Sequence, residues 1–249
     1  MTDKNKRIVV VTGASRGIGR AIALTLADHG AGVWINYYRS EQAATELAED
    51  IKQRGGSANI VKCDVTNMNE VSKMVETVKA NGNLDILINN AGPKILSKGF
   101  NDLEWDDMQA AYTNIVGSSF NVTQAALPHL KESKGKIVNV LTSAVLGRTA
   151  HNWLPYVSAK SALLGMSKNL AQELGPAGVT VNMVSPTMVD TDLTSNVPER
   201  IRQMMVSRTP LRRMATVDDV AKAVLFLASP YADFVTGDNL LVTGGDIML

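Results

Sequence analysis

Short apolar, β-branched runs alternate with helical patterns along the whole chain, and this alternation narrows the possible folds more than any other feature. The strand-like runs are residues 8–11, 33–37, 58–63, 84–88, 136–141, 179–184 and 240–242. Helical spacing first relates Ile18, Ile22, Leu24 and Leu26, and then covers residues 41–54, 71–79, 103–130, 157–174 and 217–228. Strands and helices that alternate in this way form βαβ units with a parallel sheet. We therefore predict an α/β protein with a doubly wound sheet of about seven parallel strands and helices on both faces.

The length suits one large α/β domain, since the chain has 249 residues and a mass of 26.7 kDa. No linker, repeat or low-complexity segment divides it, so residues 1–249 are predicted to form a single domain. The one long stretch outside the alternation is residues 188–216. It follows the predicted strand 179–184, at the edge where open α/β sheets bind ligands, and is predicted to form a substrate-side lid.

Charge and cysteine content limit the partners and the compartment. The formal net charge of +1 gives no electrostatic reason to expect nucleic acid or an anionic membrane. Cys63 is the single cysteine, which excludes an internal disulfide and suits a reducing compartment. No apolar run reaches the length of a membrane span, and the first residues lack signal-peptide character. We expect a cytoplasmic protein, and without paired ligands near its scattered histidines we expect no metal site.

A glycine-rich turn, TGASRGIG at residues 12–19, follows the first predicted strand and opens the first predicted helix. Glycine permits a tight turn and a close backbone approach to a pyrophosphate, and a helix N-terminus offers free N–H groups to phosphate. An ordinary strand–helix turn is the alternative. The complete context of strand, turn, helix and second strand favours phosphate binding. The candidate phosphate-binding residues are Gly13, Ser15, Arg16, Gly17, Ile18 and Gly19.

The spacing Gly13-x3-Gly17-x-Gly19 resembles the glycine motif of the short-chain dehydrogenase/reductase family, a family with a Rossmann-type fold. Further landmarks follow in the family's order: Asn89-Asn90-Ala91-Gly92, Asn114, Ser143, Tyr156-x-x-x-Lys160, residues 186–191 and Gly244-Gly245. The resemblance covers essentially the whole chain. The stretches TGASRGIGRAIA, GVTVNMVSPTMVDTDLT and DDVAKAVLFLAS most resemble the 3-oxoacyl-acyl-carrier-protein reductases within the family.

The resemblance implies four catalytic residues, Asn114, Ser143, Tyr156 and Lys160. Hydride transfer to a ketone leaves negative charge on its oxygen, which needs a proton and hydrogen-bond donors. Tyr156 would supply the proton, and Lys160, one helical turn away, is expected to lower the tyrosine pKa. By resemblance, Lys160 would also hold the nicotinamide ribose, Ser143 would bond the substrate oxygen, and Asn114 would hold a water that links Lys160 to solvent.

Each of these residues also has an ordinary structural interpretation. Tyr156 and Lys160 would then be an exposed helical pair, Ser143 a helix N-cap and Asn114 a helix-surface amide. Their joint occurrence after the glycine turn argues against these interpretations. Thr142 is a rival to Ser143, because Gly147 falls one residue later than in the usual reductase pattern, whereas the spacing from Ser143 to Tyr156 fits the family better.

The segment after the second predicted strand bears on the choice of nicotinamide cofactor. NAD enzymes place an Asp or Glu there to accept from the ribose 2′-OH. Here Arg39 follows, with no carboxylate before Glu41, and Arg16 lies in the glycine turn. Two arginines suit a 2′-phosphate and favour NADP(H), although Arg39 is also explained as a residue at a solvated helix start. Further cofactor contacts implied by the resemblance are Asp64, Val65, Asn90, Ala91, Gly92, Tyr156, Lys160, Val189 and Thr191, with a turn or N-cap role as the alternative for Asp64.

The substrate side departs from the family pattern in places. Thr187 stands where the family usually has Gly, and a β-branched residue disfavours a positive φ. Trp153 and His151 precede the predicted catalytic tyrosine and are interpreted equally well as pocket residues or as surface packing. Five arginines make the predicted lid basic, which suits an acidic carrier protein but is more often a solvated face: Arg200, Arg202, Arg208, Arg212 and Arg213.

These patterns lead to an ordered set of functional hypotheses. The first is NADPH-dependent reduction of a ketone, most favourably a 3-oxoacyl thioester bound to acyl carrier protein, in fatty-acid or polyketide-like synthesis. The second is reduction or oxidation of another substrate, such as a sugar, steroid or small ketone. The third is a non-catalytic nucleotide-binding sensor, because a fold alone never proves activity. The resemblance also implies a homotetramer.

Overall fold

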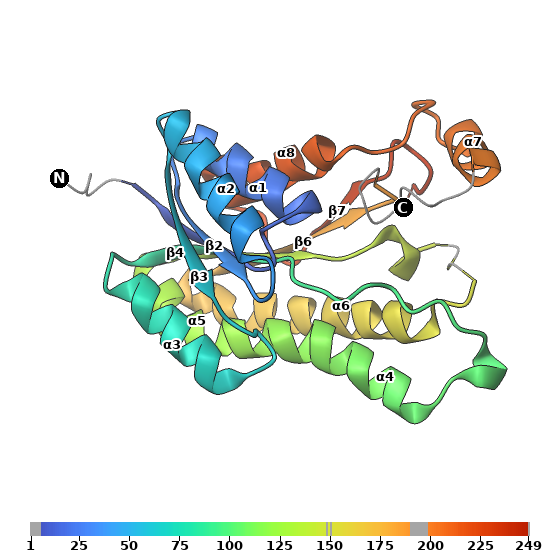
Figure 1. The fold of residues 1–249 in the computed structure, drawn as a ribbon, viewed down its shortest axis with the longest axis horizontal. Helices are drawn as coiled ribbons and strands as arrows, with labels where there is room; N and C mark the ends of the chain where they lie inside the picture. Colours follow the sequence, from blue (N-terminus) through green and yellow to red (C-terminus); the bar gives the residue numbers. More distant parts are fainter. Residues whose placement is uncertain (1–5, 148, 150, 190–198, 249) are drawn as a thin grey trace.

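The computed structural model describes residues 6–147, 149, 151–189 and 199–248, and its centre is a single parallel sheet (Figure 1). Its strands are β1 (Ile8–Val11), β2 (Gly32–Tyr37), β3 (Ser57–Lys62), β4 (Leu84–Asn89), β5 (Lys136–Val140), β6 (Thr180–Pro186) and β7 (Asn239–Val242). They lie in the order β3-β2-β1-β4-β5-β6-β7, and every neighbouring pair is parallel. The predicted doubly wound, single-domain α/β fold is confirmed.

Helices cover both faces of this sheet (Figure 1). They are α1 (Gly17–Asp28), α2 (Glu41–Gln53), α3 (Met68–Lys79), α4 (Trp105–Tyr112), α5 (Ser118–Ser133), α6 (Leu154–Leu174), α7 (Glu199–Arg208) and α8 (Val217–Ala228). Helices α1, α2 and α8 lie on one face, and α3, α4, α5 and α6 lie on the other. All strands run in one direction, so their carboxyl ends meet at one edge of the sheet, where a ligand site is expected.

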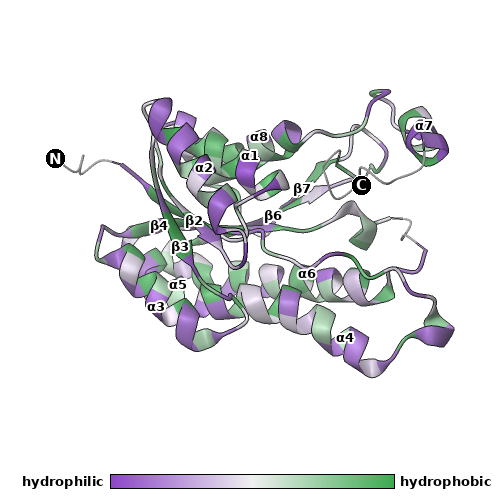
Figure 2. Cartoon of the chain, viewed as in Figure 1, coloured by the Kyte–Doolittle hydropathy of each residue, from purple (hydrophilic) through white to green (hydrophobic). Residues whose placement is uncertain are grey.

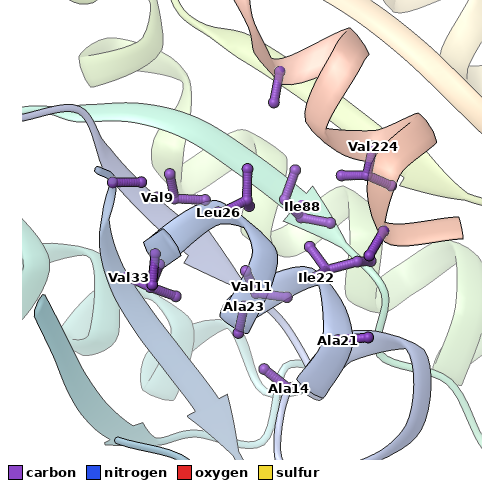
Figure 3. Close-up of a cluster of buried hydrophobic side chains, with 14 of the residues drawn as sticks. Val9, Val11, Ala14, Ala21, Ile22, Ala23, Leu26, Val33, Ile88 and Val224 are labelled. Carbon is purple, nitrogen blue, oxygen red and sulfur yellow. The ribbon is translucent and has the colours of Figure 1, made fainter. Parts of the chain in front are cut away.

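The apolar runs form strands because both faces of the sheet are buried. In one core cluster, Ile22 and Leu26 of α1 pack over Val9 and Val11 of β1 and reach Val224 of α8 (Figure 3). The colouring by hydropathy in Figure 2 shows apolar and polar residues mixed along each of the outer helices, as expected for helices with one buried and one exposed face. Burial of both faces removes the need for polar alternation in the strand sequences.

Several predicted helix boundaries differ from the structure, and α3 begins at Met68 rather than at residue 71. The long helical stretch predicted at residues 103–130 is present, but its hydrogen-bond pattern changes within it: α4 ends at Tyr112, a π-helical turn occupies Thr113–Gly117, and α5 follows. Helix α6 begins at Leu154 rather than at residue 157, with Pro155 in its first turn. Proline is favoured there, because its missing N–H would have no partner inside the helix.

A chain of buried side-chain hydrogen bonds joins the centre of the sheet to the helices on one face. Asn89 Nδ2 donates to Thr123 Oγ1 at 3.1 Å and to Asn139 Oδ1 at 2.8 Å. Asn139 Nδ2 donates to Ser167 Oγ at 2.7 Å, and Ser167 Oγ donates to Leu163 O at 2.6 Å. These bonds link β4 and β5 to α5 and α6. They therefore set how the helix with the predicted catalytic pair sits on the sheet.

Ser167→Ala should lower the free energy of unfolding by about 1–3 kcal/mol, because it leaves a buried donor of Asn139 unpaired. Urea unfolding measures the change as a shift in midpoint at constant slope. Ser161→Ala is the matched control, since Ser161 Oγ on the same helix donates to Val157 O from an exposed position. Equal shifts in the two variants would contradict a specific role for the buried chain.

Candidate active site

The glycine turn and the segment after β4 are joined by a compact set of hydrogen bonds. Thr12 Oγ1 accepts from the N–H groups of Asn90 and Ala91, at 2.9 and 3.0 Å. Asn90 Nδ2 in turn donates to Thr12 O at 2.9 Å and to Gly13 O at 3.1 Å. The carboxyl ends of β1 and β4 are thereby held together. Sequence reasoning singled out Asn90 and Ala91 but missed Thr12, although it opens the quoted glycine motif.

The glycines of this turn have conformations and neighbours that other residues do not tolerate. Gly13 and Gly17 have φ values of +60° and +56°. A Cβ on Gly19 would lie 2.5 Å from Asn90 Nδ2 and 2.6 Å from Gly13 O. The positive φ at two positions favours glycine, and the close neighbours at the third leave no room for a side chain.

The start of α1 fits a phosphate group. Its N-cap residue, Arg16, makes no side-chain capping bond, and the first turn holds no acidic residue. A Cβ built on Gly17 meets nothing within 4 Å, so the space above the turn is open. Uncapped N–H groups at a helix start attract an anion. Together these features suit the pyrophosphate of a nicotinamide cofactor.

The loop after β2 places a serine beside the arginine of the glycine turn. Arg16 Nη2 donates to Ser40 Oγ at 2.8 Å, and both side chains lie at the surface. The Arg39 guanidinium lies 5.3 Å from the centre of the Tyr38 ring. The N-cap residue of α2 is Ser40, whose side chain makes no capping bond, so Arg39 does not occupy the N-cap position. Sequence reasoning missed Ser40, whose signal was a hydroxyl three residues after the end of the second strand, next to Arg39.

Asp64 forms the turn that its alternative interpretation described. Its Oδ1 accepts from Thr66 N at 2.9 Å and from Thr66 Oγ1 at 2.7 Å. The N-cap of α3 is Asn67, so Asp64 is not the cap. Val65 is buried, and its carbonyl accepts from Asn121 Nδ2 at 3.3 Å. Contact of Asp64 and Val65 with adenine stays a prediction.

Lys160 is held deep in the site. Its Nζ donates to Val140 O, at the end of β5, at 2.6 Å, and lies 5.9 Å from the centre of the Tyr156 ring. The residue is 5% exposed, so the pair is not an exposed helical one. Burial lowers the Lys160 pKa to about 8, because the charged ammonium loses its hydration. A lysine with such a pKa changes its protonation near neutral pH.

The Tyr156 hydroxyl behaves differently from the sequence-based expectation. Burial raises the pKa of Tyr156 to about 12, and a hydrogen bond with the Thr142 side chain opposes that rise. The main influence on this pKa is therefore burial, which raises it, and not Lys160, which was expected to lower it. A buried phenol with a high pKa stays protonated across neutral pH, so Tyr156 carries the proton that reduction of a ketone consumes.

Thr142 and Ser143 both lie at the end of β5, in different roles. Thr142 bonds the Tyr156 side chain, and its Oγ1 also accepts from Ala144 N at 3.3 Å. Ser143 opens the 3-10 turn Ser143–Val145 and is 8% exposed. The N-cap of that turn is Thr142, so Ser143 is not the cap. The structure thus places the Thr142 side chain on Tyr156, whereas the choice of Ser143 over Thr142 as the partner of the substrate oxygen stays a prediction.

Thr142→Val should move the pH profile of alcohol oxidation to higher pH, because removing the hydroxyl raises the Tyr156 pKa further and lowers the fraction of tyrosinate at a given pH. A hydrogen bond to an ionised group contributes about 1.5–3 kcal/mol, equivalent to roughly one to two pH units. Thr142→Ser keeps the hydroxyl and should keep the wild-type profile. The measurement is the pH dependence of kcat. A shift of the pH profile in Ser143→Ala, with none in Thr142→Val, would show that Ser143 rather than Thr142 bonds the Tyr156 hydroxyl.

Asn114 lies in the π-helical turn between α4 and α5. Its side-chain Nδ2 donates to Ala110 O at 2.7 Å, and its backbone carbonyl accepts from Ser118 Oγ at 2.7 Å. Single π turns are frequent at functional sites because they redirect backbone groups. Helix α4 packs against α6, which carries Lys160. A water held by Asn114 stays a prediction.

The segment after β6 is partly described. Thr187 N donates to Val242 O at 3.2 Å, and Thr187 is not among the non-glycine residues with positive φ. The threonine therefore fits the backbone of this position. Val189 is buried and bridges to Ala215, whereas Thr191 lies outside the described residues. Gly244 and Gly245 have φ values of +60° and +89°, a conformation that favours glycine.

The predicted lid contains α7, which stands apart from the two helix layers at the carboxyl edge of the sheet (Figure 1). Two basic residues of the predicted lid have acidic partners. Arg213 Nη2 lies 2.9 Å from Asp219 Oδ1, and Arg208 Nη2 lies 3.4 Å from Asp246 Oδ1. These two arginines therefore serve internal ion pairs as well as surface charge.

Neither a membrane-spanning helix nor a metal-ligating cluster occurs within the described part of the chain. No helix among the described residues is long and apolar enough to cross a membrane. Residues 6–147, 149, 151–189 and 199–248 likewise contain no group of three or more His, Cys, Asp or Glu side chains placed to hold a metal ion.

Comparisons with known proteins agree with this arrangement. A family model described as enoyl-(acyl carrier protein) reductase matches residues 13–246. The 3-oxoacyl-[acyl-carrier-protein] reductase FabG of Staphylococcus aureus (strain N315) is 38% identical over 251 residues, 98% of this chain and 100% of that protein. The 7alpha-hydroxysteroid dehydrogenase of Escherichia coli (strain K12) is 35% identical over 246 residues, 97% of this chain and 94% of that protein.

Solved structures are similar over nearly the whole chain. A 7α-hydroxysteroid dehydrogenase complexed with NADH and 7-oxo glycochenodeoxycholic acid superposes with a TM-score of 0.91 at 35% identity, covering 97% of this chain and 94% of that one. A short-chain dehydrogenase/reductase mutant of Serratia marcescens gives 0.90 at 32% identity, covering 96% and 97%. The chain therefore belongs to the short-chain dehydrogenase/reductase family and is an oxidoreductase that acts on CH–OH or C=O groups with a nicotinamide cofactor.

Proposed function

We propose that this enzyme reduces the ketone of a 3-oxoacyl thioester, carried by acyl carrier protein, to a secondary alcohol with NADPH. The observation that supports the chemistry best is Tyr156 beside a buried Lys160 that is bonded to Val140 O. Similarity to FabG over 98% of the chain supports the substrate class. Similarity to a steroid dehydrogenase supports a second candidate, a steroid ketone.

The chain's own residues would handle the oxygen and the proton of the ketone. When bound, the cofactor supplies the hydride. Tyr156 would donate its proton to the ketone oxygen as negative charge develops there. The hydroxyls of Thr142 and Ser143, at the end of β5, would hold the phenol and the substrate oxygen. Lys160, with a pKa of about 8, would return a proton to Tyr156. A water held by Asn114 would then link Lys160 to solvent, from which the lysine regains its proton.

The preference for NADPH is supported by the residues around the end of β2. Arg16 and Ser40 are joined at 2.8 Å, and Arg39 lies next to that pair in the sequence. Guanidinium and hydroxyl donors match the oxygens of a 2′-phosphate. Glu41 is the first acidic residue after β2 and lies inside α2. The 7α-hydroxysteroid dehydrogenase complex contains NADH, so the choice needs a direct measurement.

We also propose that the enzyme works as a cytoplasmic homotetramer. Large apolar side chains that are exposed on the described chain support association: Trp105, Tyr112 and Phe120 lie along α4 and α5, and Tyr231 and Phe234 follow α8. Exposed aromatic residues of this kind mark protein interfaces more often than a monomer's surface. Sedimentation equilibrium measures the assembly, and a monomer at assay concentration would contradict the proposal.

The proposal is tested by following cofactor absorbance with purified protein. The substrates are acetoacetyl thioester of acyl carrier protein, acetoacetyl-N-acetylcysteamine and a 7-oxo bile acid, each with NADPH and with NADH. Rapid oxidation of NADPH with the thioesters is the expected result. Turnover of the bile acid alone would replace the first candidate with the second. Binding of NADPH without turnover of any ketone would favour a sensor.

A further inference from the structure

Trp153 occupies a position that the start of a helix does not explain. It is the N-cap residue of α6, where it makes no side-chain capping bond. An indole has a donor but no acceptor, so it has nothing to offer the free N–H groups of a helix start. Its ring instead meets the ring of Tyr156 edge to face, with centroids 6.0 Å apart and planes at 87°. The indole is half-buried, so part of its surface is open to a ligand.

The segment that carries Trp153 is fixed in place from two sides. Asn152 has a φ of +62°, which turns the chain sharply just before the tryptophan. Its carbonyl accepts from Lys98 N at 3.0 Å. Lys98 Nζ also donates to Asp107 Oδ2 of α4, at 2.8 Å. The loop after β4 and helix α4 therefore both hold the segment next to the predicted proton donor.

The contact between the two rings leaves the indole within reach of a substituent on a carbonyl that is bonded to the Tyr156 hydroxyl. A ketone oxygen that takes a proton from Tyr156 must come within about 2.6–3.2 Å of the hydroxyl. The carbonyl carbon lies ~1.2 Å farther out, which puts it roughly 6 Å from the phenol ring. The indole centroid lies 6.0 Å from that same ring. The carbonyl carbon and the indole thus lie at similar distances from the phenol ring, and a substituent that extends toward Trp153 would reach the indole.

We propose that Trp153 is a specificity-determining residue whose indole limits the space beside the reacting carbonyl. It favours ketones that are unbranched at the neighbouring carbon, such as a linear 3-oxoacyl thioester, over their 2-methyl counterparts. The inference rests on the proposed function for the natural substrate, but the contact with Tyr156 applies to any ketone seated there. A flat apolar wall also suits the methylene groups of an acyl chain.

The test compares acetoacetyl-N-acetylcysteamine with its 2-methyl derivative, using NADPH as cofactor. Trp153→Ala should raise kcat/KM for the branched substrate at least 10-fold relative to the unbranched one, since a pocket discriminates one methyl group by about 10–200-fold. Trp153→Phe should give an intermediate ratio. The pH profile of kcat should stay as in the wild type, because the indole does not titrate. The NADPH Kd serves as the folding control.

Leu154→Ala is the matched control, because it truncates the adjacent, 44% exposed side chain of the same segment. Its ratio of kcat/KM values should equal that of the wild type. Equal losses for both substrates in Trp153→Ala, or an equal change of ratio in Leu154→Ala, would overturn the inference. If the wild type reduces neither thioester, the proposed function fails. Cyclohexanone and 2-methylcyclohexanone then supply the ratio that decides the role of Trp153.

Discussion

Tyr156→Phe is expected to lower kcat for carbonyl reduction by about 10²–10⁴-fold, the range that a positioned general acid contributes. Phenylalanine retains the ring that packs against Trp153 and lies near Lys160, and only the hydroxyl is lost. The NADPH Kd should therefore change little. Stopped-flow absorbance under single-turnover conditions measures the chemical step directly. Turnover at the wild-type rate would show that another group supplies the proton.

In the wild-type enzyme, the rates of carbonyl reduction and alcohol oxidation should respond to pH in opposite ways. Burial raises the Tyr156 pKa to about 12, so the phenol is protonated at neutral pH, as reduction requires. Alcohol oxidation requires the tyrosinate, whose fraction rises with pH up to that pKa. Oxidation should therefore accelerate as pH rises above neutral, whereas reduction should slow above about pH 8, where Lys160 loses the proton that it returns to Tyr156. Both directions need Lys160, and its pKa of about 8 places the change in its charge inside the same interval.

The strands could be predicted from the sequence because burial on both faces leaves continuous apolar runs. The run at residues 8–11 coincides with β1, and the run at 240–242 lies within β7. Helix ends were harder to predict. A search for apolar periodicity passed over Pro155, which lies in the first turn of α6 and is itself a start signal. The π turn near Asn114 has no compositional signature, because it changes only the backbone hydrogen-bond pattern.

The site residues were predictable where a motif fixes them and unpredictable where geometry decides. The placement of Lys160 against the end of β5 follows from its spacing to Tyr156 and from burial of the start of α6. The choice between Thr142 and Ser143 depends on how the chain turns after β5, which the local amino-acid sequence does not reveal. Ser40 was missed for a similar reason, because its partner Arg16 is distant in sequence and only the fold brings them together.

Arg16→Ser is expected to lower the ratio of kcat/KM with NADPH to kcat/KM with NADH by about 10–150-fold. The estimate takes one lost hydrogen bond to a charged group, about 1.5–3 kcal/mol, as the change in discrimination. Arg16 lies at the uncapped start of α1 and is joined to Ser40, so its guanidinium is placed where a 2′-phosphate would follow β2. NADH lacks that phosphate, so its kcat/KM should change little.

Arg20→Ser supplies the matched control for that ratio. Arg20 is one helical turn further along α1, and its Nη2 pairs with Asp50 Oδ2 at 3.0 Å instead of facing the glycine turn. The variant removes the same charge from the same helix and should leave the cofactor ratio as in the wild type. A similar fall in both variants would mean that general positive charge, rather than a contact with Arg16, attracts NADPH. A wild-type enzyme that uses NADH as well as NADPH would remove the basis of the cofactor assignment, while the argument from Tyr156 and Lys160 would stand.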